Sequence, residues 1–160
     1  MILINFKGTK INGTSSVDEH KDWIPVDSMQ MGVGRGISVS GTAKDREVSN
    51  PSMSEISFSK VTDISSTDLW MQATCGKSLG DCEIHFMQTG GADVKQQPYL
   101  IIILTEAIVS SYSMSSGGER PSESFSINFT KISYQYNEFD GAKVTTGTAK
   151  IWDLKNNAKG

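Results

Sequence analysis

The sequence predicts a mostly β fold, an antiparallel barrel or sandwich of about 8–10 strands with one short α-helix. Three observations lead to this prediction. The dominant apolar period is two residues, one segment alone carries helical signals, and glycine- and serine-rich stretches separate the strand-like segments. A chain of 160 residues can bury one core, so residues 1–160 are expected to form a single domain.

Alternation of apolar and other residues is clearest at residues 2–6, 56–60 and 82–87, which predicts half-buried strands. Residues 99–105 are apolar on both faces, which predicts a strand that is covered on both sides. Residues 107–115 follow closely, and we interpret them as the continuation of one long bent strand.

The segment 123–136 contains two apolar sets of opposite parity. Odd positions are apolar over 125–129 and even positions over 132–136. The phase changes near Thr130 and Lys131, so a β-bulge or a sharp bend there is expected to keep both sets on one core. Long bent strands of this kind are typical of closed or nearly closed barrels.

Residues 65–75 carry the signals of a short helix. Ser65 is a suitable N-cap, with Asp68 as its capping-box partner, and Ile64 and Leu69 occupy the positions of a hydrophobic staple. Gly76 stands where a helix commonly ends in a left-handed residue. The covered stripe is expected to include Leu69 and Ala73, with either Trp70 or Gln72.

Composition excludes several classes of function. Hydrophobic residues make up 37% and charged residues 21% of the chain, the net charge is −3, and basic residues are scattered. Phosphate binding needs clustered Lys and Arg, so neither nucleic acid nor an anionic membrane is expected as a partner. No apolar run is long enough to insert into a membrane. Residues 1–8 do not resemble a signal peptide, so we expect a cytoplasmic protein that leaves the cell, if at all, by another route.

Two short motifs resemble catalytic or cofactor-binding sequences, but both lack the spacing or the flanking elements that such sites require. Residues 32–36 read GVGRG, but the spacing of a nucleotide-binding loop is missing and no helix pattern follows. Residues 76–80 read GKSLG, yet a helix precedes them and a strand follows, the reverse of a nucleophile elbow around Ser78. His20 and His85 are the available bases, and nothing places either beside Ser78. We therefore predict no catalytic residue and no cofactor.

Cys75 and Cys82 are expected to be two reduced thiols, with a disulfide that closes the intervening turn as the alternative. Only His85 and Asp81 could join them around a metal ion, and the spacing matches no zinc pattern. We therefore predict no metal site.

The long stretch at about 32–51 is rich in glycine, then small and polar, then charged, and carries little that could build a core. It is open to three interpretations: a phosphate-binding loop, a linker, or a surface that another chain completes. Since the sequence offers no catalytic site, we favour the third interpretation, a surface that another chain completes, and hence an interaction protein. The alternative is a stand-alone β-barrel binding module or enzyme, which would depend on residues such as His20 or Ser78.

Four blocks in order resemble the Hcp family, the haemolysin-coregulated proteins of the bacterial type VI secretion system. They are residues 20–34, 55–77, 99–136 and 152–160, and one departure is Ile151, where the family often has glycine. The matching positions include Phe58, Lys60, Asp63, Ser66, Leu69, Gly76, Tyr99, Leu104, Tyr112, Gly117, Gly118, Glu123, Phe129, Lys131, Ile132, Tyr136, Trp152 and Asp153.

The resemblance implies a structural tube subunit rather than an enzyme. Six copies form a ring, rings stack into a hollow tube inside a contractile sheath of sheath proteins, and contraction expels the tube with a spike protein at its tip. Small effectors travel as cargo in the lumen, so the protein is secreted without a cleaved signal.

The resemblance also suggests roles for two sets of residues. The extended loop is expected to reach the neighbouring ring, with Arg35, Lys44, Asp45, Arg46 and Glu47 as ring-stacking residues. Ser28 and Gln30 are expected to face the lumen, and Met29 and Met31 to face the barrel core.

Overall fold

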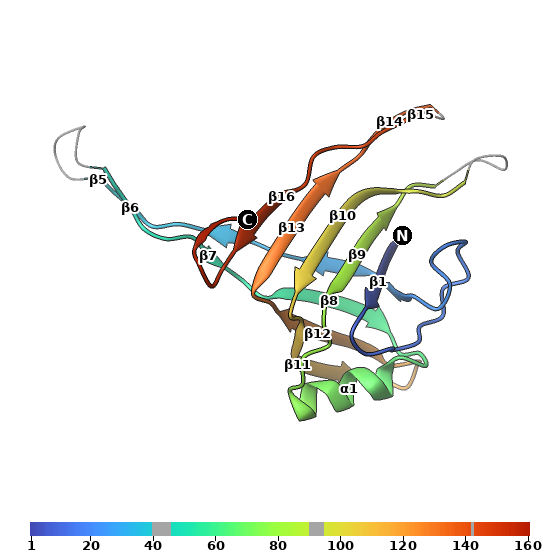
Figure 1. Ribbon diagram of the computed structural model, residues 1–160. Coiled ribbons are helices and arrows are strands. Elements are labelled where there is room, and N and C mark those ends of the chain that lie inside the picture. Colours follow the sequence, from blue (N-terminus) through green and yellow to red (C-terminus); the bar gives the residue numbers. More distant parts are fainter. Residues whose placement is uncertain (40–45, 90–94, 142) are drawn as a thin grey trace.

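The computed structural model describes residues 1–39, 46–89, 95–141 and 143–160, with the side chains of all of these except 39, 46 and 47. Two antiparallel sheets pack across one core, and the helix α1 (Ser66–Cys75) lies along the smaller sheet (Figure 1). The predicted mostly β class with one short helix is confirmed. Among the described residues, no helix has the length and apolar character that crossing a bilayer requires.

The larger sheet has seven strands and the smaller has four. Together they contain slightly more strands than the expected number of about 8–10. The larger sheet has the order β17 (Ala158–Lys159), β16 (Lys150–Asp153), β13 (Lys131–Tyr136), β10 (Pro98–Thr105), β9 (Cys82–Met87), β1 (Ile2–Phe6) and β2 (Ile24–Val26). The smaller has the order β11 (Ile108–Ser115), β12 (Ser122–Asn128), β8 (Ile56–Val61) and β3 (Ser28–Gln30).

Three short two-stranded ribbons extend from these sheets. They pair β4 (Val33–Gly34) with β7 (Ser52–Met53), β5 (Ile37–Val39) with β6 (Arg46–Val48), and β14 (Glu138–Asp140) with β15 (Lys143–Thr145). The predicted extended loop at 32–51 therefore contains paired strands rather than irregular chain.

The core lies between the two sheets and is built from the apolar sets that the alternation predicted. Phe58 on β8 and Phe125 on β12 stand opposite each other in register and stack with ring centroids 5.1 Å apart. Ile4, Ile84 and Leu104 of the larger sheet are fully buried in the same cluster. Burial of these side chains is the main source of stability, since each contributes roughly 1.5–3 kcal/mol.

The prediction of one continuous strand over 123–136 is wrong, but the sharp bend expected near Thr130 is present, and Phe129 and Ile132 on its two sides reach the same core. The phase change marks a corner at which the chain leaves the smaller sheet at the end of β12 and enters the larger sheet as β13. At that corner the Thr130 amide donates to the carbonyl of Thr105, at 3.0 Å. Ile132 faces the core, but Tyr134 and Tyr136 are 44% and 58% exposed.

The second corner connects β10 to β11, which also lie in different sheets rather than forming one strand. Glu106 turns the chain there with a positive φ of 54°. The prediction that residues 99–105 are covered on both sides is wrong for the single chain. Ile102 and Leu104 are buried, whereas the alternate residues Ile101 and Ile103 are only half-buried.

The helix begins and ends as predicted, but its N-terminus is held differently. Gly76 adopts the left-handed conformation with φ 65° and donates its amide to the carbonyl of Gln72. Ser65 makes no capping hydrogen bond; its hydroxyl donates to Asp63 Oδ1 at 2.5 Å instead, so the predicted capping box is absent. Ile64 is 65% exposed, so it forms no staple with Leu69.

The covered stripe of α1 consists of Leu69 and Ala73, as expected, while Trp70 points outward with 53% exposure. Gln72 is half-buried, so it is the better of the two alternatives for the third position. The stripe contacts the core cluster and positions α1 beside β11.

Candidate assembly surfaces

The first surface is an arm, defined as residues 32–54, whose described parts, 32–39 and 46–54, leave the body of the molecule and extend far from it (Figure 1). At its base Met53 of β7 packs against the core cluster, whereas the β5–β6 ribbon exposes apolar side chains. Ile37 and Val48 stand opposite each other in register and are 53% and 51% exposed. Ser49 Oγ accepts from the Gly36 amide at 2.7 Å and donates to the Gly36 carbonyl at 3.0 Å, which ties the two chains of the arm together.

The predicted ring-stacking residues all belong to this arm. Arg35 is exposed between β4 and β5. Arg46 and Glu47 lie on β6, with their side chains outside the described part of the structure. Lys44 and Asp45 lie outside the described residues altogether. The arm therefore places Arg35 away from the body, and the stacking role of the set stays a prediction.

The second surface, the serine face, is the side of the smaller sheet that points away from the core. We define it by two rows of four residues across β3, β8, β12 and β11, and a further row of Val61, Ser122 and Ser115 continues the same side on three of these strands. The rows are Ser28, Ser59, Ser124 and Ser113, and Gln30, Ser57, Ser126 and Ser111.

Hydroxyl pairs stabilise the serine face across its strands. The Oγ atoms of Ser113 and Ser124 share a hydrogen bond of 2.7 Å, as do those of Ser111 and Ser126. The hydroxyl of Ser28 is hydrogen-bonded to that of Ser59. None of the eight residues carries a charge, so these two rows form a polar and uncharged surface. Single residues such as Ser28 and Gln30 could be assigned to it from the sequence, but the four-strand register that unites them could not.

Met29 and Met31 do not behave alike, contrary to expectation. Met29 on β3 packs against the core, opposite Phe58 in register. Met31 follows the end of β3 and is 39% exposed. Ser28 and Gln30 are exposed on the serine face, and their position in a lumen stays a prediction.

The two histidines do not form a catalytic site with Ser78. His20 Nε2 and His85 Nδ1 share a hydrogen bond of 2.8 Å, and the ring of Trp23 packs against both imidazoles. Ser78 Oγ accepts from the amide of Gly80 at 3.4 Å, as a turn residue does. The pairing of His20 with His85, 65 residues apart, has no signal in the sequence.

The histidine pair has a clear electrostatic consequence. Burial, followed by the positive charges of His20 and Lys7, lowers the pKa of His85 to about 4. The imidazole of His85 is therefore neutral at pH 7 and can share the hydrogen bond with His20.

The cysteines are both free thiols, with Cys75 exposed and Cys82 buried, so the disulfide alternative is excluded. Burial raises the pKa of the Cys82 thiol far above its usual value, which keeps it protonated and unreactive. Within the described ranges, no three histidine, cysteine or acidic side chains gather as metal ligands.

A family model described as "Type VI secretion system effector, Hcp" matches residues 4–136. This chain belongs to the Hcp family. Its members are secreted structural tube proteins of type VI secretion and not enzymes.

Individual relatives agree with membership of the Hcp family. Protein hcp1 of Pseudomonas aeruginosa is 35% identical over 109 residues, a match that covers 66% of this chain and 66% of that one. A solved type six secretion system protein superposes with a TM-score of 0.88 at 26% identity, covering 99% of this chain and 98% of its own.

Two more distant structures share the fold. Hcp1 from Salmonella typhimurium has a TM-score of 0.73 at 20% identity, with 99% of this chain and 97% of that one covered. A type VI secretion system effector from Yersinia pestis has a TM-score of 0.72 at 21% identity, with 96% and 99% covered.

Proposed function

We propose that this chain is the tube subunit of a type VI secretion system. Six copies form a ring, rings stack into a hollow tube, and contraction of the sheath proteins expels the tube with a spike protein at its tip. Small effectors travel inside the lumen. The protein is made in the cytoplasm and leaves the cell without a cleaved signal peptide.

The observation that carries this proposal is the two-sided smaller sheet. One side packs on the core, the other is the neutral serine face, and the outer edges of β3 and β11 have no strand partner among the described residues. Unpaired edges recruit further strands. A head-to-tail contact between opposite edges closes into a ring when the rotation per subunit divides a full turn.

A ring built this way has a continuous inner wall of hydroxyl groups. Such a wall offers no ion pairs and few apolar contacts, so it binds a passing protein weakly and without regard to its charge. This suits a lumen from which effectors must be released. The arm then extends along the tube toward the next ring, where the exposed Ile37 and Val48 gain a partner.

Native mass spectrometry at neutral pH and moderate salt tests the ring. A dominant species at six times 17.4 kDa is expected. A clean monomer at every concentration would contradict it and would favour the alternative of a stand-alone binding module or enzyme.

Electron microscopy tests the stacking role of the arm. The double variant Ile37→Ser, Val48→Ser is expected to keep single rings and to lose tubes, because its substitutions remove the apolar pair from the arm alone. The matched control is Ile64→Ser, which removes an apolar side chain that lies outside the arm and is somewhat more exposed, at 65%. Tubes of normal length in the arm variant would contradict the stacking role.

A further inference from the structure

The larger sheet extends past the β3 edge of the smaller sheet, so part of its core-facing side is left uncovered (Figure 1). The uncovered part of this side is evident from the exposure of the side chains along β13. Ile132, Tyr134 and Tyr136 point to the same side, and their exposed fractions rise from 5% to 44% to 58%. Two aromatic rings on a core-facing side are thus open to solvent.

We call this surface the step and define it by Met31, Tyr134, Tyr136 and Lys150. Lys150 stands opposite Tyr134 in register on β16. The step opens into a groove of about 630 Å³, which is lined in part by its residues Met31, Tyr134 and Lys150 and by Trp152. The indole Nε1 of Trp152 is buried and has no hydrogen-bond partner in the described structure. The step therefore exposes one methionine and two tyrosine side chains, with the cation Lys150 beside them.

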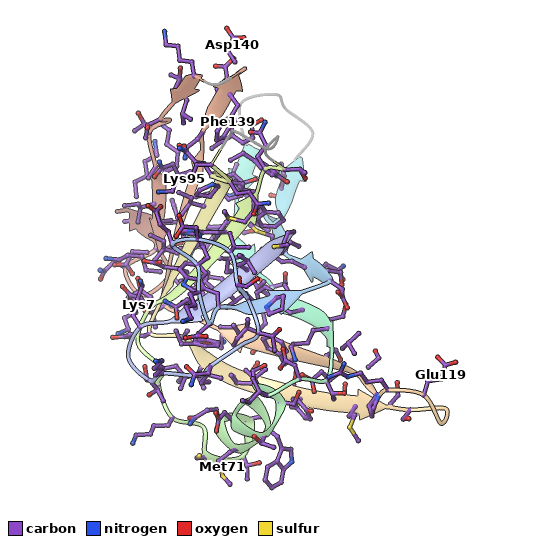
Figure 2. All side chains as sticks on the ribbon, turned by 90° about the vertical axis from the view of Figure 1, so that its right-hand side faces the viewer. Lys7, Met71, Lys95, Glu119, Phe139 and Asp140 are labelled. Carbon is purple, nitrogen blue, oxygen red and sulfur yellow. The ribbon has the colours of Figure 1, made fainter. Side chains whose placement is uncertain are left out.

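A second apolar surface lies at the other end of the molecule, on the outward side of α1. Trp70 and Met71 are 53% and 47% exposed there. Figure 2 shows Met71 at one end of the molecule and Phe139 and Asp140 at the other. Asp68 is the only charged residue of α1, so this surface carries a negative charge.

The two surfaces follow one another along a single direction. α1 packs beside β11, and then come β12, β8 and β3, with the step beyond the β3 edge. Moving a second copy along this direction places its α1 over the step of the first copy. The same movement brings together the outer edges of β11 and β3, neither of which has a strand partner among the described residues.

We propose that α1 of one subunit docks on the step of the next, with Trp70 and Met71 covering Tyr134 and Tyr136 and with Asp68 facing Lys150. The occupant is a second copy of this chain, because both apolar surfaces belong to one chain and their charges are opposite in sign. The proposal rests on the proposed ring and names the contact that closes it.

Truncation of the central aromatic residue is the first test. Trp70→Ala is expected to raise the concentration at which half of the rings dissociate by at least about tenfold, as loss of an interface tryptophan typically does. Ile64→Ala is the control, because Ile64 is 65% exposed but lies outside α1. Circular dichroism of both variants verifies that the subunit is folded. Equal ring dissociation of the two variants would overturn the docking of α1.

Cross-linking provides a test that does not depend on a weakened variant. Met71→Cys and Lys150→Cys are introduced together in a Cys75→Ser background, where the remaining Cys82 is buried. A short bismaleimide is expected to give a ladder of covalent oligomers up to six subunits. Each single-cysteine variant is expected to give none, because the contact is heterologous.

The outcomes separate this contact from the ring itself. Rings of the double-cysteine variant that show no ladder would overturn the docking of α1 on the step while leaving the proposed function intact. An unaltered chain that stays monomeric in native mass spectrometry would overturn both.

Discussion

At the scale of single residues, the most consequential group is a set of buried charges beneath the N-terminus of α1. Lys60 Nζ donates to Glu123 Oε1 at 2.6 Å and to Asp63 Oδ1 at 2.8 Å. Glu123 also accepts from Ser66 Oγ at 2.9 Å and from the Tyr112 hydroxyl at 2.5 Å. Burial, together with this hydrogen bond, raises the pKa of Tyr112 to about 12. The network thus joins β8, β11, β12 and α1 through one carboxylate.

Removing that carboxylate is expected to be costly. Glu123→Ala leaves the Lys60 ammonium buried without its closest partner, so the free energy of unfolding is expected to fall by about 3–5 kcal/mol. The control is Glu119→Ala at the exposed loop between β11 and β12 (Figure 2), which is expected to change it by less than about 0.5 kcal/mol. Urea denaturation at one protein concentration measures both. Equal effects would contradict the role of the network.

The histidine pair predicts a dependence of stability on pH. The pKa of His85 is about 4 in the folded chain and about 6.5 in the unfolded chain. The unfolded chain therefore binds more protons over this interval, and stability falls as pH decreases from about 6.5 to about 4. After burial, the charged neighbours that lower the pKa of His85 are His20 and Lys7, while the Glu83 carboxylate lies 3.9 Å from His85 Nε2, and Asp18, Glu19 and Lys95 lie on the His20 side of the pair.

Urea denaturation midpoints at pH 7 and pH 5 measure this effect. The unaltered chain is expected to lose more stability between the two values than the His85→Gln variant, which cannot titrate at that position. Fluorescence of Trp23, which contacts both imidazoles, reports the opening of the pair. The same pH dependence in the variant would show that other groups cause it.

At the scale of elements, sequence patterns that span a few neighbouring residues predicted the helix end and the core strands well. Features that depend on contacts with residues distant in the sequence were not predicted. Gly76 ends α1, and the alternation at β1, β8 and β9 gives the core. Ser65 is a favoured N-cap residue, yet its hydroxyl binds Asp63, because Asp63 is held in place by Lys60.

The phase change between β12 and β13 shows the same limit of local signals. A bulge and a corner between two sheets give the same alternation of apolar residues, and only the pairing of each half with other strands separates them. The candidate surfaces were likewise predictable only where local sequence determines them. The arm could be located from its composition, but the step depends on how far one sheet extends past another.

The end of α1 allows a matched test of backbone conformation. Gly76 has φ 65° and Gly34 does not adopt a positive φ, while a Cβ atom added to either would meet nothing within 4 Å. Gly76→Ala is therefore expected to destabilise the fold by about 1–2 kcal/mol through backbone strain alone. Gly34→Ala is expected to change stability by less than about 0.5 kcal/mol. Thermal unfolding of both variants, which should differ clearly, checks this.

At the scale of the whole molecule, uncharged polar surface and exposed apolar surface lie on different sides of the subunit. The serine face is neutral, the arm exposes Ile37 and Val48, and the two ends of the subunit expose the apolar side of α1 and the step. A protein that worked alone would have no use for three apolar surfaces in three directions, since exposed apolar patches mark contacts. A subunit that closes a ring, stacks it and leaves the bore free of strong contacts needs each of them.

Chemical labelling tests whether the serine face lines the bore. Ser57 is exposed at its centre, so Ser57→Cys in a Cys75→Ser background places one accessible thiol there. In assembled tubes, a small maleimide is expected to react, while a maleimide carrying a long polyethylene glycol chain is expected to react far more slowly. Glu119→Cys, on the exposed loop, serves as the control and is expected to react with both reagents. Adding the Trp70→Ala change, which weakens the ring, should restore the reaction of Ser57→Cys with the bulky reagent. If Ser57→Cys in tubes reacts with it as fast as Glu119→Cys does, the serine face lies outside the tube, and the bore must be lined by the larger sheet.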